Sequence, residues 1–387
     1  MIFQIAAFPE EIRDYMVKVR RHLHAYPELS LKEEQTRDYI LGELDRLGIS
    51  HQVVGTTGVL GQLKGQKDGR KLLIRCETDA LPLTEETGYD FSSTNEGVMH
   101  ACGHDAHMAV VLGLAKFLVE KQVVFSGTIL FLFQPAEEIG AGARMVLEDF
   151  DRLGIRPDEC ISVHTGSELP LGKISIKAGP VMAGTRTMKA MIRGEGGHAS
   201  RPDVTIDPIS AMLSFLTDAQ RLKDRTISPF EDAVLSFTGV HAGTKTNIVP
   251  ETCEVWASMR FFKDEVGEQL KDILTRSARA TEIASGVTID LVFSPGVPPV
   301  VNDRNVIRKL TAAAEKTFGR DNILSNERLM ASDDFGRYLE RWPGAYTFAG
   351  SGSQRIEIHP GHSPRYAVDE EVMVYIVTYY LNYIAGA

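Results

Sequence analysis

Hydrophobic and polar positions along the first half of the chain follow the periods of helices and of short buried strands. Residues 10–25 and 31–47 repeat apolar side chains every three to four positions, which predicts two amphipathic helices. Further along, the pattern predicts a helix over 108–121 and three buried strands, namely KLLIRCETDA (71–80), TILFLFQPAEE (128–138) and CISVHTG (160–166). Buried strands that alternate with helices indicate an α/β domain with a mostly parallel central sheet.

The polar residues that follow these strands are the first indication of a site. In a parallel sheet the carboxyl ends of the strands meet at one edge, and ligands bind there. Polar residues stand at 77–79, 137–138 and 164, where the three predicted strands end. We therefore expect these positions to lie close together.

The middle of the chain has a different pattern. It predicts a strand, a helix, two strands, a helix and a strand, at 185–196, 207–223, 233–243, 251–262, 265–285 and 287–293. This βαββαβ order is typical of a ferredoxin-like α+β domain. Gly179–Pro180 and Ser294–Pro295 mark its ends, and a helical pattern returns afterwards. We predict a catalytic domain of residues 1–181 and 296–387, interrupted by a smaller inserted domain of residues 182–295.

Composition and charge narrow the class of protein. The net charge of −10 gives no long-range attraction to nucleic acids or anionic membranes, so neither is an expected partner. Four scattered cysteines do not form a disulfide framework, which favours a reducing, cytoplasmic location. The apolar C-terminal run VMVYIVTYYLNYIAGA is too short and too polar for a membrane span and predicts a packed helix.

The stretch MHACGHDAHM, residues 99–108, carries the densest group of reactive side chains. Cys102 and His104 lie on a glycine-containing turn before a helix, and a thiolate beside an imidazole suits a dication such as zinc. An alternative is that Cys102 is a nucleophile, because a helix N-terminus and nearby histidines lower the pKa of a thiol. That alternative gives no role to the carboxylates further along the chain.

Two adjacent carboxylates, Glu137 and Glu138, follow a buried strand in QPAEE. One can bind a metal while the other takes a proton from a metal-bound water, which is the division of labour that hydrolysis requires. His164 ends another strand, and HPGHSPRY contains both His359 and His362. Cys102, His104, Glu138, His164 and one C-terminal histidine make five ligands, a number that suits two metals sharing a bridge, and a thiolate can be that bridge.

Taken together, the motifs identify the chain as similar to the amidohydrolase branch of the aminoacylase/carboxypeptidase metallopeptidases. The resemblance covers nearly the whole chain and rests on RRHLHAYPELSLKEEQT (20–36), DALP (79–82), MHACGHDAHMA (99–109), FQPAEE (133–138), GEGGHASRP (194–202) with DP (207–208), TNIVPE (246–251), DDF (333–335) and HSPRY (362–366). It implies a zinc-peptidase-like catalytic domain with an inserted lid and dimerisation domain.

The resemblance also implies roles for single residues. The metal ligands would be Cys102, His104, Glu138, His164 and His362, with Cys102 bridging and with His362 chosen over His359 because HSP is the ligand motif. Glu137 would be the general base, and Asp79 would orient a histidine ligand. From the inserted domain, His198 would polarise the scissile carbonyl across a dimer interface, and Asn247 and Arg260 would hold a substrate carboxylate.

Three motifs depart from the pattern of the relatives. Cys76 and Glu77 stand where alanine and aspartate are usual, Asp333 stands where glutamate is usual, and Thr165 follows His164 where an aromatic residue or proline is common. These departures concern the surroundings of the predicted ligands and the substrate pocket, and leave the ligands themselves in place.

We therefore expect a metal-dependent amidohydrolase that cleaves N-acyl amino acids with two divalent ions (zinc, manganese, nickel or cobalt) and forms a homodimer or a higher homo-oligomer through the inserted domain. Two other classes stay open. A cysteine hydrolase would resist chelators and lose activity on thiol alkylation. A non-catalytic pseudoenzyme would bind metal or ligand without turnover.

Overall fold

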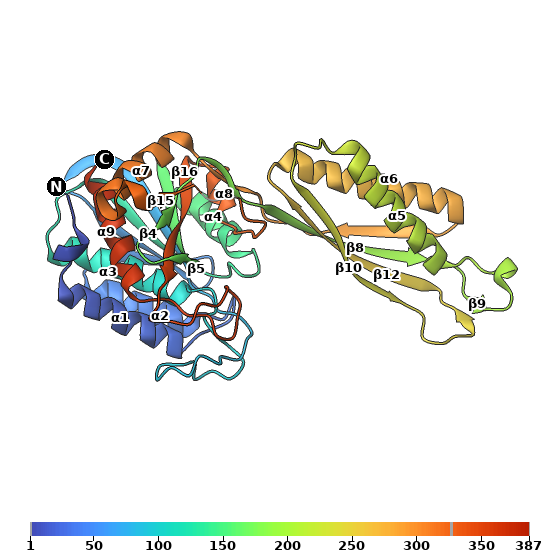
Figure 1. Cartoon of the computed structure of the whole chain (residues 1–387), viewed down its shortest axis with the longest axis horizontal. Helices are drawn as coiled ribbons and strands as arrows, with labels where there is room; N and C mark the ends of the chain where they lie inside the picture. The colour runs from blue at the N-terminus through green and yellow to red at the C-terminus, as the bar shows by residue number, and fades with distance from the viewer. Residues whose placement is uncertain (1, 326–327, 387) are drawn as a thin grey trace. The chain divides into compact units, whose positions relative to one another are not determined.

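The computed structural model describes residues 2–325 and 328–386, which divide into two compact units (Figure 1). The first unit comprises residues 1–181, 301–327 and 333–387, and the second comprises residues 182–300 and 328–332, as far as these are described. The second unit therefore extends five residues beyond the predicted boundary at residue 295. The reason is that Val297 pairs with Thr185, which keeps residues 296–300 on the second unit. Leu329 pairs with Met182, which likewise keeps residues 328–332 there.

The first unit is built on an eight-stranded sheet with the order β1-β2-β4-β3-β5-β16-β6-β15. The strand pairs β4–β3, β3–β5 and β5–β16 at its centre are parallel. Its strands are β1 (Ser50–Val54), β2 (Gly58–Lys64), β3 (Lys67–Glu77), β4 (Ser126–Gln134), β5 (Glu159–Pro170), β6 (Ile174–Ser175), β15 (Ile323–Leu324) and β16 (Gly344–Gly352). The predicted α/β fold with a mostly parallel sheet is confirmed.

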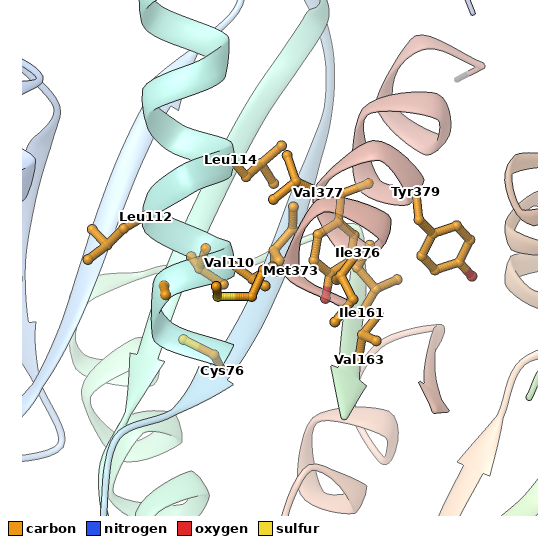
Figure 2. Packing of buried hydrophobic residues seen from close by; sticks show 14 of the residues in the cluster. Cys76, Val110, Leu112, Leu114, Ile161, Val163, Met373, Ile376, Val377 and Tyr379 are labelled. Carbon is orange, nitrogen blue, oxygen red and sulfur yellow. The ribbon is translucent and has the colours of Figure 1, made fainter. Parts of the chain in front are cut away.

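Helices cover both faces of this sheet (Figure 1). They are α1 (Glu10–Ala25), α2 (Glu34–Arg46), α3 (His104–Glu120), α4 (Gly142–Leu153), α7 (Arg304–Phe318), α8 (Gly336–Leu339) and α9 (Glu371–Ala385). Figure 2 shows the core, in which Ile161 and Val163 of β5 pack with Val110 of α3 and Val377 of α9. The helices α3 and α9 are apolar on nearly all sides because they lie between the sheet and other helices. No helix within the described residues is long and apolar enough to cross a membrane.

The ends of the strands set the position of the site. The pattern predicted strands reaching residues 80 and 138, but β3 ends at Glu77 and β4 ends at Gln134. Proline has no amide hydrogen for a sheet ladder, so Pro135 stops β4. Because β3 and β4 are parallel and pair Glu77 with Gln134, their ends lie side by side. The two segments that carry the predicted ligands leave the sheet from this edge.

The second unit has a four-stranded antiparallel sheet with the order β10-β12-β8-β13. Its elements are β8 (Gly184–Arg193), α5 (Pro208–Thr226), β10 (Ala233–Ala242), β12 (Thr252–Phe261), α6 (Asp264–Ser285) and β13 (Thr288–Phe293), with a short pair of β9 (Gly197–His198) and β11 (Ile248–Val249). The chain order of these elements is βαββαβ. The strands β7 (Gly179–Met182) and β14 (Val300–Asn302) pair where the chain passes between the units.

Candidate active site

His104 is held so that one ring nitrogen faces the other predicted ligands. It is the first residue of α3, a few residues earlier than the helix start expected from sequence. Its Nδ1 donates a hydrogen bond of 2.8 Å to the backbone carbonyl of Asp79, which leaves the lone pair of Nε2 available. Nε2 lies 3.9 Å from Oε1 of Glu138. Both atoms are buried and have no hydrogen-bond partner within the described part of the chain.

Asp79 braces this arrangement through both its backbone and its carboxylate. Its carboxylate Oδ1 is 3.6 Å from Nδ1 of His104, too far for a good hydrogen bond, whereas its backbone carbonyl takes that bond. Oδ2 accepts hydrogen bonds from the Ser30 hydroxyl at 2.7 Å and from the backbone N–H of Glu138 at 3.0 Å. Asp79 thus links His104 to the segment that carries Glu138.

His164 and Cys102 form the second part of the cluster. His164 Nδ1 donates to the backbone carbonyl of Thr165 at 2.7 Å, and its Nε2 lies 3.4 Å from the Cys102 sulfur. Burial lowers the pKa of His164 to about 3, so its ring is neutral at physiological pH. A neutral imidazole is the form that binds metals.

His362 completes the group from the C-terminal segment. Its Nε2 lies 3.5 Å from Oε2 of Glu138, and its backbone N–H donates to Ala101. Its φ of 65° lies in the left-handed region, which costs a non-glycine residue roughly 1–3 kcal/mol. The neighbouring His359 instead faces Glu357 at 3.2 Å. Of these two histidines, only His362 belongs to a group of potential ligand atoms among the described residues.

The residues fit a metal centre. Ligand atoms of Cys102, His104 and His164 lie within 4.8 Å of one another, and so do those of Cys102, Glu138 and His362. Cys102 belongs to both groups, and its sulfur is therefore common to two sets of nitrogen and oxygen donors. The buried, unpartnered Nε2 of His104 and Oε1 of Glu138 are the kind of atoms that a dication satisfies.

Cys102 is poorly suited to act as a free nucleophile. Burial raises the pKa of its thiol to about 12. Nucleophilic cysteines have lowered pKa values, whereas a metal ion deprotonates a coordinating thiol outright. The surroundings of Cys102 therefore favour a ligand over a nucleophile.

Glu137 lies beside the cluster and close to two further carboxylates, those of Asp333 and Asp334. Its carboxylate is within 4.8 Å of ligand atoms of both His104 and Glu138, and also of Asp333 and Asp334. Burial, followed by the charges of Asp333 and Glu138, raises the pKa of Glu137 well above its ordinary value. The turn that presents Glu137 contains Ala136 in a left-handed conformation, with φ of 54°. A carboxylate with a raised pKa next to metal ligands is suited to taking up a proton.

The three predicted residues of the second unit do not form one group. His198 and Asn247 are near each other, since His198 pairs with Ile248 and Asn247 accepts from Ala199. Arg260 lies near the far end of β12, where it donates to Ser332 at 3.1 Å. The eight residue-to-residue steps from 252 to 260 span about 26 Å at 3.3 Å per step. Within one copy of the chain, Asn247 and Arg260 are too far apart to hold the same carboxylate.

Sequence reasoning missed the buried charged network beneath the site. Arg75 is fully buried in β3 and contacts three carboxylates, those of Glu77, Asp333 and Asp334. Burial, followed by the charge of Asp333, raises the pKa of Asp334 to about 7, although Arg75 opposes this. The available signal was Arg75 itself, because a lone arginine inside an apolar strand is almost always paired.

Comparison with known proteins places this chain in a family. The model of peptidase family M20/M25/M40 matches residues 73–385. The chain belongs to this family. The resemblance stated from the motifs is thereby confirmed, as is the prediction of a hydrolase of the metallopeptidase class.

Individual members of the M20/M25/M40 family resemble the chain over almost its whole length. It is 35% identical over 369 residues to thermostable carboxypeptidase 1 of Saccharolobus solfataricus, with 94% of this chain and 93% of that protein covered. It is 35% identical to an N-acetylcysteine deacetylase of Bacillus subtilis, with 94% of each covered. Among solved structures, a dinuclear metal-binding M20 peptidase of Bacillus subtilis superposes with a TM-score of 0.83 at 31% identity and 98% coverage of both chains.

Proposed function

We propose that this chain hydrolyses the amide bond of N-acyl amino acids, with Cys102, His104, Glu138, His164 and His362 holding two divalent metal ions. The observation that carries the proposal is the pair of ligand groups that share Cys102, with Glu137 beside them. The relatives named as a deacetylase and a carboxypeptidase cleave bonds of this chemical kind. When bound, the metal ions would lower the pKa of a water molecule and polarise the acyl carbonyl.

The residues of the chain would divide the remaining work. Glu137 would take a proton from the attacking water and later return it to the leaving amine, and its raised pKa suits the second step. His104 and His164 would keep their Nε2 lone pairs available, because the Nδ1 of each donates to a backbone carbonyl. Asp79 would hold the backbone of Glu138 in place.

The second unit would bind the organic part of the substrate. We propose that His198 stabilises the oxyanion and that Asn247 and Arg260 bind carboxylate oxygens. Because Asn247 precedes the start of β12 and Arg260 lies near the other end of that strand, about 26 Å from Thr252, one substrate could engage both only if they came from different copies. This spacing supports the proposed homodimer.

The proposal is tested by metal content together with hydrolysis. Elemental analysis should find about two divalent ions per chain, and a panel of N-acetyl and N-benzoyl amino acids should be cleaved until chelation removes the ions. Glu137→Gln should keep the metal while turnover falls by about 10²–10⁴-fold. Full turnover in a metal-loaded Glu137→Gln protein would exclude Glu137 as the base. Activity that survives chelation and is lost on alkylation would return Cys102 to the role of nucleophile.

A further inference from the structure

His107 stands one helical turn after His104, and it forms a group with Glu77 and His104 that has the composition of a metal site. Its hydrogen bonds argue against that role. Nε2 accepts a hydrogen bond of 3.0 Å from the backbone N–H of Thr165, so the proton is on Nδ1, which donates to Glu77 Oε2 at 2.8 Å. Neither ring nitrogen has a lone pair left for a metal.

The ring of His107 is packed against two of the proposed ligands. Its centroid lies 4.6 Å from the centroid of His164, with the rings at 68°, and 5.7 Å from the centroid of His104. His107 is buried, so its ring cannot rotate away without displacing one of these neighbours. Its bond from the Thr165 amide also fixes the residue directly after His164.

The partner of His107 is itself fixed by a buried arginine. Glu77 forms an ion pair with Arg75 Nη1. The guanidinium is anchored in turn by Asp333 Oδ1 at 3.0 Å, Asp334 Oδ1 at 2.9 Å and Gln134 Oε1 at 3.0 Å. This network draws on β3, β4 and the segment that begins at residue 333, so the backbone of three separate elements determines where Glu77 can lie.

We propose that His107 is a positioning residue, through which the Arg75–Glu77 ion pair sets the ring of His164 against Cys102. This inference rests on the proposed metal centre and assigns a role that the ligands alone do not reveal. Partners that orient metal ligands commonly change metal affinity by about 10–100-fold when they are removed. His107 acts one residue further from the metal, on the packing and backbone of His164.

The experiment measures zinc affinity by competition with a chromophoric chelator in the full-length protein. His107→Phe keeps a ring of similar shape and removes both hydrogen bonds, and it should bind zinc about 10–100-fold more weakly. The matched control is His100→Phe, since His100 is equally buried in the same motif but neither of its ring nitrogens has a partner among the described residues. His100→Phe should bind zinc nearly as tightly as the wild type.

A second readout separates positioning from general stability. In cobalt-substituted protein, the thiolate-to-cobalt absorption band reports the geometry at Cys102, and His107→Phe should shift or weaken it whereas His100→Phe should not. If His107→Phe does not fold, Glu77→Gln, which keeps the shape but loses the ion pair to Arg75, should lower zinc affinity in the same direction. Equal zinc affinities and cobalt bands in the His107→Phe and His100→Phe proteins would overturn the inference. Absence of zinc binding in the wild type would instead refute the proposed function.

Discussion

His24 gives the first unit a stability that depends on pH, and the contacts of its ring determine the size of the effect. The ring is buried between two carboxylates, with Nδ1 2.9 Å from Asp105 Oδ2 and Nε2 3.1 Å from Glu85 Oε1. Burial alone would lower the pKa of His24. The charge of Asp105 and the hydrogen bonds to Asp105 and Glu85 outweigh burial, and the pKa rises from 6.5 to about 9.

The sign and magnitude follow from linkage. Because the folded state holds the proton more tightly than the unfolded chain, the contribution is complete below pH 6.5 and is lost as the pH rises through about 9. A rise of about 2.5 pH units, at 1.36 kcal/mol per unit, corresponds to about 3 kcal/mol. The contact with His24 also lowers the pKa of Glu85 to about 2, even though burial opposes this. Because it is the same interaction, its free energy is not added a second time to the figure of about 3 kcal/mol.

The assay compares the free energy of unfolding by urea at pH 6 and pH 9.5, on metal-free protein. His24→Gln should lose about 3 kcal/mol more at pH 6 than at pH 9.5 relative to the wild type, and this difference cancels groups that titrate equally in both proteins. His22→Gln is the control on the same helix. His22 is exposed overall, and the partial burial of its ring lowers its pKa, so the folded state does not favour the protonated form and its replacement should bring no extra loss at pH 6. The same loss for His24→Gln at both pH values would refute the reasoning.

Two further predictions concern the surroundings of the proposed ligands. Glu77→Asp and Asp333→Glu should each lower the melting temperature, because both carboxylates contact Arg75. The double variant keeps the charge and the total number of methylene groups, so it should recover most of the loss. Strictly additive losses in a thermal-shift assay would contradict this coupling. Gly103→Ala should reduce the free energy of unfolding by urea more than Gly97→Ala does. Both glycines have positive φ, but only at Gly103 would a Cβ lie 2.6 Å from the Thr165 hydroxyl oxygen, so equal losses would refute the steric argument.

The proposed ligands could be predicted because they stand in short motifs at strand ends. His104 and Cys102 are two residues apart, and the parallel pairing of β3, β4 and β5 brings the segments that follow these strands to one edge of the sheet. The alternation of buried strands and helices was sufficient to predict that edge. The sequence pattern did not reveal β16, which pairs along β5 and completes the centre of the sheet.

The hydrogen-bonding partners of the ligands could not be predicted in the same way. Asp79 uses its backbone carbonyl for His104 and its carboxylate for Ser30 and Glu138. This choice of partners depends on how the side chains rotate, and differences of tenths of an ångström in atom positions decide it. No spacing in the chain encodes that choice. The Arg75 network is equally hidden, because Arg75 and Asp333 are 258 residues apart.

The structure places three of the four residues expected to depart from the family pattern in one network. Glu77 and Asp333 both contact Nη1 of Arg75. Glu77 is one methylene longer than the expected aspartate and Asp333 is one methylene shorter than the expected glutamate, so the two changes compensate each other around the guanidinium. Thr165, the unusual residue after His164, places both its amide and its hydroxyl 3.0 Å from His107 Nε2, while Glu77 binds the Nδ1 of the same ring. Cys76 points instead into the apolar core (Figure 2).

Three of the four departures therefore lie in one network, between Arg75 and the ring of His107. In a buried network a change at one residue leaves its partner unsatisfied, at a cost of several kcal/mol, unless the partner changes as well. Such residues are expected to vary as a set, while Cys102, His104 and His164 stay unchanged. If the network sets the position of His164, substitutions at these three residues should change metal affinity more than they change the choice of substrate.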